Sequence, residues 1–224
     1  MVIRAVVFDL DGLMFDTEAL FYRVSCDALA ARGKSFTNEM MQAMIGRRAV
    51  DAAHAWKILA GLDEPAETLL ADVRQRFFAL VDTAVHPTPG LIVLLDRLAH
   101  RGLPLAVATS SRREYADRLL SQHGLLQRFQ FILASEDVTR GKPDPEIYRL
   151  AAERFAVPPS SILVLEDSPA GLAAAKGAGA FAVGVPHEHS TAQALHDADM
   201  LVSRLDEPAL LSLFEFANEG PTTA

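Results

Sequence analysis

The stretch Ala5-Val6-Val7-Phe8-Asp9-Leu10-Asp11-Gly12 near the N-terminus decides the fold class. Its apolar and partly β-branched residues show no helical period, which is typical of a strand buried on both faces of a parallel sheet. Two carboxylates follow at positions i and i+2, and the next residue is a glycine that permits a tight turn. The stretch therefore predicts a buried parallel strand with two acids at its carboxyl end.

Further apolar runs of the same kind occur in the C-terminal two-thirds of the chain, at 104–109, 131–134, 162–166 and 181–185. Amphipathic helical stretches separate them. This β–α alternation predicts an α/β fold, a doubly wound, Rossmann-like parallel sheet. The predicted helix starts include a capping box formed by Ser111 and Glu114 and an N-cap formed by Ser168 before Pro169.

The alternation stops between the first strand and the second. This part of the sequence predicts consecutive helices, with Gly33 and Gly61 as stop signals, over 18–33, 38–46, 50–61 and 66–84. Two prolines at 87 and 89 then mark the return to the sheet. We therefore expect a core made of 1–17 and 85–224, with an inserted all-helical cap over 18–84.

Composition excludes several classes of function. The formal net charge of −8 opposes binding to nucleic acid, which needs a concentrated basic surface. No apolar run reaches membrane-spanning length, and the first residues do not resemble a signal peptide. The single cysteine, Cys26, excludes an internal disulfide. We expect a cytoplasmic protein with no nucleic-acid or membrane partner; the sequence predicts no oligomeric state, and a monomer is compatible with it.

Acids stand at the ends of two predicted strands. Asp9 and Asp11 follow the first strand, and Glu166 and Asp167 end the strand at 162–166. Ligands bind beyond the carboxyl ends of the strands in open α/β sheets, so these acids are expected to lie near one another. Carboxylates this close repel unless a cation intervenes, and oxygen ligands suit a hard divalent ion. The pattern therefore predicts a Mg²⁺ site.

Partners for a phosphate stand at other strand ends. Thr109, Ser110 and Ser111 supply hydroxyls and helix N-terminal amides, and Lys142 precedes a predicted helix. Together with the acids and a metal, these donors predict a phosphoryl-transfer site. His187, in His187-Glu188-His189, lies after the last predicted strand without further ligands nearby in sequence, so we expect an exposed loop there rather than a metal site.

The stretch Asp-Leu-Asp-Gly-Leu-Met-Phe-Asp-Thr at 9–17 resembles the first motif of haloacid dehalogenase-like phosphatases, DxDGxxxDT. Thr109 resembles the Ser/Thr of the second motif and Lys142 the lysine of the third. The pair Glu166-Asp167 resembles the acids of the fourth. All four motifs occur in order, so the resemblance covers nearly the whole chain.

The resemblance implies roles for these residues. Asp9 would attack phosphorus and form an aspartyl-phosphate, while Asp11 would protonate the leaving oxygen and later activate water. Mg²⁺ would be held by Asp9, Asp11 and Asp167, with Glu166 ordering metal-bound water. Thr109, the Ser110 amide and Lys142 would hold the transferring oxygens. The helical insert resembles the cap of the β-phosphoglucomutase-like branch, with Glu18, Arg47 and Arg48 as candidate substrate contacts.

The predicted function is a magnesium-dependent phosphatase that acts on a small phosphorylated metabolite, with a sugar phosphate expected. A sugar-phosphate mutase of the β-phosphoglucomutase type is the first alternative, although its pattern has a histidine where this chain has Phe21. A dehalogenase is disfavoured because such enzymes lack the acid at the position of Asp11. A non-catalytic module that binds phosphorylated metabolites is the remaining alternative.

Overall fold

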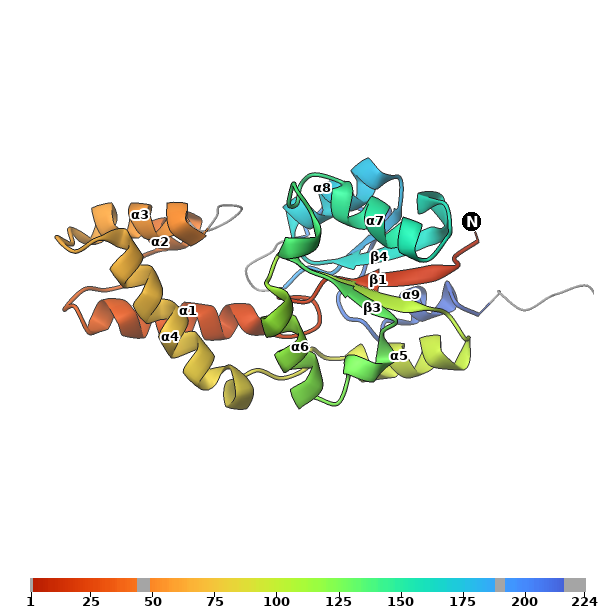
Figure 1. Cartoon of the computed structure of the whole chain (residues 1–224), viewed down its shortest axis with the longest axis horizontal. Helices are drawn as coiled ribbons and strands as arrows, with labels where there is room; N and C mark the ends of the chain where they lie inside the picture. The colour runs from red at the N-terminus through yellow and green to blue at the C-terminus, as the bar shows by residue number, and fades with distance from the viewer. Residues whose placement is uncertain (1, 44–48, 188–191, 216–224) are drawn as a thin grey trace, which may run out of the picture. The chain divides into compact units, whose positions relative to one another are not determined.

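The computed structural model of the chain describes residues 2–43, 49–187 and 192–215. It divides into two compact units (Figure 1). One unit comprises Met1–Asp16 and His86–Ala224, and the other comprises Thr17–Val85. The first is called the sheet unit below and the second the helical unit. Within the described residues, no helix is both long and apolar enough to span a membrane.

The sheet unit contains one parallel sheet. Within the described residues its order is β3-β2-β1-β4-β5-β6. The strands are β1 (Ala5–Phe8), β2 (Leu105–Ala108), β3 (Phe131–Leu133), β4 (Ile162–Glu166), β5 (Phe181–Gly184) and β6 (Met200–Leu201). All five neighbouring pairs are parallel. The predicted α/β fold with a doubly wound sheet is confirmed. The two-residue strand β6 was not predicted, because it is too short to show a period.

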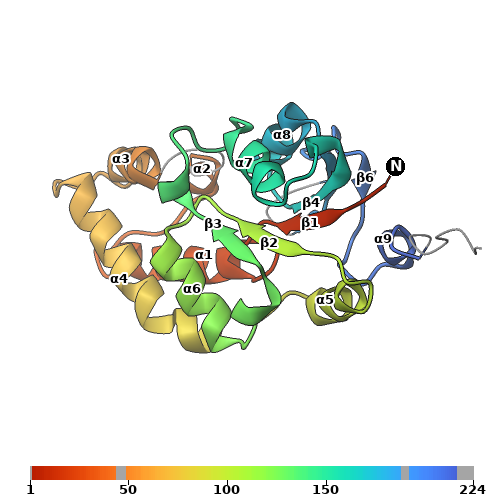
Figure 2. The same ribbon diagram turned by 45° about the vertical axis from the view of Figure 1, so that its right-hand side comes forward.

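Helices cover both faces of this sheet. They are α5 (Leu91–His100), α6 (Arg113–Gln122), α7 (Glu146–Arg154), α8 (Pro169–Ala178) and α9 (Pro208–Ser212), with 3₁₀ turns η1 (Leu126–Arg128), η2 (Ser135–Asp137) and η3 (Pro159–Ser161). Figures 1 and 2 show α7 and α8 on one face of the sheet and α5 and α6 on the other. The chain adds β2 and β3 on one side of β1 and then β4 and β5 on the other side. Because parallel crossovers are right-handed, opposite directions along the sheet place the helices on opposite faces.

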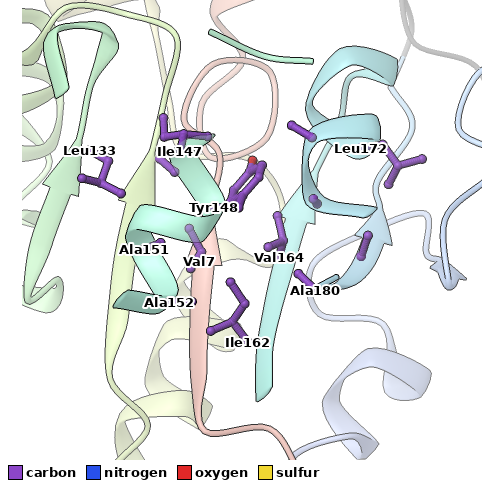
Figure 3. Close-up of a cluster of buried hydrophobic side chains, with 14 of the residues drawn as sticks. Val7, Leu133, Ile147, Tyr148, Ala151, Ala152, Ile162, Val164, Leu172 and Ala180 are labelled. Carbon is purple, nitrogen blue, oxygen red and sulfur yellow. The ribbon is translucent and has the colours of Figure 1, made fainter. Parts of the chain in front are cut away.

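One cluster of the core of the sheet unit lies between β1, β4 and the helices α7 and α8. Val7, Val164 and Tyr148 are fully buried there, and Figure 3 shows their side chains converging between the strands and α7. Both faces of β1 are covered, so every residue of this strand is buried. The apolar character of the first strand is therefore explained by its central position in the sheet.

The helical unit contains α1 (Thr17–Ala30), α2 (Asn38–Gln42), α3 (Ala49–Ala60) and α4 (Ala66–Ala84). Helix α4 packs against both α1 and α3. The buried Trp56 donates its indole N–H to the carbonyl oxygen of Met40 at 2.7 Å, which ties α3 to α2. Arg32 joins the end of α1 to α4 through an ion pair with Asp72 at 2.5 Å. This unit therefore has its own buried residues and its own polar links.

Candidate active site

Polar side chains gather at the carboxyl ends of three adjacent strands. Asp9 directly follows β1, Thr109 directly follows β2, and Glu166 is the last residue of β4. Phe8 pairs with Val107 on one side and with Leu165 on the other, so these three strands end at the same level. The sheet order reverses direction at β1, and such a switch point is where open α/β sheets bind ligands.

The side chain of Lys142 is only 5% exposed, and its ammonium group links the ends of β1 and β4. Its Nζ atom donates to a carboxylate oxygen of Asp9, to Glu166 Oε1 at 2.6 Å and to the carbonyl oxygen of Ala108 at 2.9 Å. Burial alone would lower the pKa of Lys142, but the charges of Asp9 and Glu166 outweigh burial and the pKa is raised. Lys142 is therefore an ammonium ion in the folded protein.

Glu166 is completely buried and receives hydrogen bonds on both carboxylate oxygens. Lys142 and the hydroxyl of Tyr148 donate to Oε1. The backbone N–H and hydroxyl of Ser168 lie 3.3 and 3.0 Å from Oε2. The Ser168 hydroxyl also accepts from the N–H of Gly171 at 3.1 Å, so its predicted role as the N-cap of α8 is confirmed.

Asp9, Glu166 and Asp167 can share one cation. Each offers a carboxylate oxygen, and these oxygens lie within 4.8 Å of one another. The three side chains carry two more negative charges than Lys142 neutralises. Burial is the largest cause that raises the pKa of Asp9; Lys142 lowers it, and the charges of Glu166 and Asp167 raise it further. A divalent cation would compensate this excess charge, so the donor set fits a hard metal ion such as Mg²⁺.

The turn after β1 brings the backbone close to this group of carboxylates. Gly12 has a φ of +83°, and a Cβ atom placed there would lie 2.0 Å from Asp167 Oδ2. A side chain is therefore excluded on two grounds, backbone conformation and space. The same Asp167 oxygen lies 3.0 Å from Nε2 of His187. His187 is half-buried, so the expectation of an exposed loop is wrong at this residue.

The carboxylate of Asp11 has a different set of partners. Ser111 Oγ donates to Oδ2 at 2.6 Å, and the hydroxyl of Tyr115 donates to Oδ1 at 2.9 Å. Thr109 Oγ lies 3.5 Å from Oδ2. The carboxylate of Asp11 thus lies beside the segment that follows β2 and the first turn of α6.

The prediction that Ser111 and Glu114 form a capping box is wrong. Helix α6 begins at Arg113, its N-cap is Arg112, and no side chain caps it. The hydroxyl of Ser111 donates to Asp11 instead. A hydroxyl is held more strongly by a charged carboxylate than by a neutral partner, and the sequence around Ser111 does not reveal this distant acceptor.

The segment after β2 is fixed from several directions. The N–H of Ser111 donates to Thr109 Oγ at 3.0 Å, and the N–H of Ser135 donates to the carbonyl oxygen of Ser111 at 3.0 Å. Thr109 is buried, whereas Ser110 is exposed. This arrangement leaves Ser110 at the surface of the sheet edge, where it can contact an anionic ligand.

The structure thus brings together most of the predicted site residues in the sheet unit: Asp9, Asp11, Thr109, Ser110, Lys142, Glu166 and Asp167. Of the predicted cap contacts, Glu18 lies in the first turn of α1 in the helical unit, and Arg47 and Arg48 lie outside the described residues. Sequence reasoning missed the contacts of Tyr115 and Tyr148, because a tyrosine on an amphipathic helix carries no signal that its hydroxyl meets a buried acid.

Open parallel α/β sheets bind small ligands at the carboxyl ends of their strands, and the carboxylates and the lysine gathered there place this chain in that class of proteins. A family model described as haloacid dehalogenase-like hydrolase matches residues 6–185. The chain belongs to this family.

Similar proteins support the assignment. Validoxylamine A 7′-phosphate phosphatase of Streptomyces hygroscopicus subsp. limoneus is 35% identical over 91% of this chain and 95% of that protein. A phosphorylated carbohydrates phosphatase of Thermotoga maritima is 30% identical over 87% of this chain and 91% of that protein. The structure of CbbY from Rhodobacter sphaeroides in complex with phosphate is 28% identical, with a TM-score of 0.78, and covers 94% of this chain and 100% of that one. The predictions of the family and of a phosphoric monoester hydrolase are confirmed.

Proposed function

We propose that this hydrolase is a Mg²⁺-dependent phosphatase of small phosphorylated metabolites, with a sugar phosphate as its substrate class, and that Asp9 is its nucleophile. The observation that supports this most directly is the site around Asp9, where a buried carboxylate contacts one lysine and adjoins two further acids. The relatives named above as phosphatases of phosphorylated carbohydrates support the substrate class.

The chain's own residues supply the steps of the reaction. An oxygen of Asp9 forms a bond to phosphorus while the bond to the leaving oxygen breaks, and Asp11 gives its proton to that oxygen. Lys142, the Thr109 hydroxyl and the Ser110 amide hold the transferring oxygens. Water then attacks the phosphorus of the aspartyl-phosphate, its proton passes to Asp11, and Asp9 is released with phosphate.

Asp9 and Asp167 would hold the metal ion, together with the backbone carbonyl of Asp11. When bound, Mg²⁺ supplies positive charge that offsets the repulsion between the acids and the phosphate. The carboxylate of Glu166 already accepts hydrogen bonds from Lys142, Tyr148 and Ser168, so Glu166 would order the groups around the metal rather than bind it directly.

Phosphatase is preferred to mutase because of the position of Phe21. The Phe21 ring packs against Trp56 and Phe77 in the helical unit, with centroid separations of 6.1 and 6.2 Å. A phenyl ring offers no group that can accept or donate a proton, whereas the mutase pattern has a histidine there. Water is therefore the proposed acceptor of the phosphoryl group.

The proposed activity is tested by phosphate release from a panel of hexose, pentose, glycolate and nucleoside phosphates, with and without Mg²⁺. The matched control is Asp9→Asn, which keeps the shape of the side chain and removes the nucleophile. Turnover that needs Mg²⁺ and disappears in Asp9→Asn is expected. Absence of release at high enzyme concentration would contradict the proposal, and isomerisation of a phosphosugar without net release would favour the mutase.

The metal site is tested without turnover. Mg²⁺ is expected to raise the melting temperature of the wild-type protein, because a ligand that binds only the folded state stabilises it. Asp167→Asn should abolish this shift. Asp197→Asn changes an acid that is 77% exposed and should preserve it. An equal shift in all three proteins would show that Mg²⁺ acts elsewhere.

A further inference from the structure

The carboxylate of Asp11, the proposed acid and base, accepts hydrogen bonds from two hydroxyl groups. Ser111 Oγ donates to Oδ2 at 2.6 Å, and Tyr115 Oη donates to Oδ1 at 2.9 Å. Each oxygen of the carboxylate thus has its own donor. Two bonds to different oxygens fix the plane of the carboxylate, which a single bond would leave free to turn about the side-chain torsions.

The two donors are themselves rigidly placed. Tyr115 lies in the first turn of α6 and is only 8% exposed. Ser111 is anchored by its backbone, because its N–H donates to Thr109 Oγ and its carbonyl oxygen accepts from Ser135. The positions of the two donors are therefore set by the end of β2 and the start of α6. The orientation of the Asp11 carboxylate depends on these two elements.

The carboxylate of Asp11 can still exchange protons in this arrangement. An ionised carboxylate has about four lone-pair sites, and these two short hydrogen bonds occupy one on each oxygen. Each oxygen can still exchange a proton with a substrate oxygen or with water. The hydroxyls thus orient the carboxylate without blocking it, which is what a proton-transfer group needs.

We propose that Tyr115, with Ser111, is a positioning residue for the proton transfers of Asp11. The inference rests on the proposed phosphatase function and adds to it a residue outside the four motifs. Tyr115 does not touch the phosphorus or the leaving oxygen. It acts through Asp11, and its hydroxyl matters only where the reaction needs a proton to be delivered or removed.

The test uses Tyr115→Phe in the full chain, with two kinds of substrate. An alkyl phosphate needs a proton on its leaving oxygen as the bond to phosphorus breaks, whereas 4-nitrophenyl phosphate releases a stable phenolate. The value of kcat/KM reports the steps up to leaving-group departure. We expect Tyr115→Phe to lower kcat/KM by about tenfold to a hundredfold for the alkyl phosphate and by much less for the aryl one.

A double variant shows whether the effect passes through Asp11. In an Asp11→Asn background, where proton transfer by this side chain is already lost, adding Tyr115→Phe should change kcat/KM little. Tyr22→Phe is the matched control, because it removes the same atom from a tyrosine that is 41% exposed, and it should match the wild type. Melting temperatures of all variants identify any loss of folding, and Ser111→Ala provides a second variant with the same expected dependence on the leaving group.

Three kinetic results would overturn the inference: unchanged or faster turnover in Tyr115→Phe, equal losses on both substrates, or a loss that persists undiminished with Asp11→Asn. A crystal structure of Tyr115→Phe gives a readout that needs no turnover. Its Asp11 carboxylate should occupy more than one orientation, and a single unchanged orientation contradicts the inference. Failure of the proposed function is seen separately, as a wild-type protein that releases no phosphate or is insensitive to Asp9→Asn.

Discussion

Glu166 is a fully buried acid whose environment leaves no spare room. Its carboxylate is bonded to Lys142, Tyr148 and Ser168, and a Cβ atom at Gly171 would lie 1.8 Å from Oε1. Glycine at this position therefore reflects a lack of space next to a side chain that cannot move. The requirement for glycine at position 171 is set by the side chain of Glu166, which lies across the turn between β4 and α8.

Gly171→Ala is predicted to lower the free energy of unfolding by about 1–3 kcal/mol and to reduce activity, because the new methyl group displaces Glu166. Gly177→Ala on the same helix is the control, since its Cβ would meet Pro145 at an ordinary distance of 3.4 Å. The control should be neutral or slightly stabilising, because alanine favours a helix more than glycine does. Urea denaturation of both variants measures the difference, and equal stabilities would refute the explanation.

At the scale of elements, Asp137 ties together the parts that surround the end of β3. Its carboxylate accepts from the N–H of Ala134 at 2.8 Å, from the guanidinium of Arg113 on α6, and from that of Arg154 at the end of α7. Helix α6 begins two residues after Ser111, so Asp137 also holds the segment that faces Asp11. A single acid thus fixes a strand end and two helices.

Asp137→Ala is predicted to cost about 2 kcal/mol of unfolding free energy, because it removes charge-assisted hydrogen bonds from a half-buried site. Asp96→Ala is the comparison, since this acid is 51% exposed and pairs with Arg128. Its loss should cost at most about 0.5 kcal/mol. Chemical denaturation of the two variants under the same conditions tests this, and a larger loss in Asp96→Ala would contradict it.

At the scale of the whole molecule, both units contain acids with lowered pKa values. In the helical unit, burial would raise the pKa of Asp72, but hydrogen bonds from Arg32 and Arg76 outweigh it. In the sheet unit, burial acts likewise on Asp199, and the N–H of Ala182 and the ammonium of Lys176 outweigh it. Each acid binds a proton less readily in the folded chain than in the unfolded chain.

Stability is therefore predicted to fall as the pH drops below about 4, the ordinary range of an aspartate pKa. Above that value the lowered pKa values contribute their full stabilisation; below it the unfolded chain binds protons first and is favoured. The raised pKa of Asp9 has the opposite effect on stability, because the folded chain binds this proton more readily than the unfolded chain. This effect occurs at pH values above the ordinary pKa of an aspartate. Melting temperatures from pH 7 to pH 3 test this. Asp72→Asn should weaken the decline below pH 4, and a stability that rises there would disprove the prediction.

The sequence by itself determined the features that depend on local pattern. Buried parallel strands showed as apolar runs, and the helical segment after β1 showed as a loss of alternation. The acids showed as charged residues at strand ends. Parallel strands place their carboxyl ends at one edge of the sheet, so the positions of Asp9 and Glu166 at strand ends were enough to predict that they lie near one another. The bonds from Lys142 to both acids were seen only in the structure.

Only the tertiary structure decided which neutral side chains serve these charged groups. The hydroxyls of Ser111 and Tyr115 reach Asp11, and that of Tyr148 reaches Glu166, because α6 and α7 pack where their first turns face the ends of β1 and β4. A hydroxyl bonds to whichever acceptor packing brings within about 3 Å, and residues distant in sequence supply that acceptor. The local sequence around Ser111 favours a helix cap, and the charged carboxylate of Asp11 outcompetes that role in the folded chain.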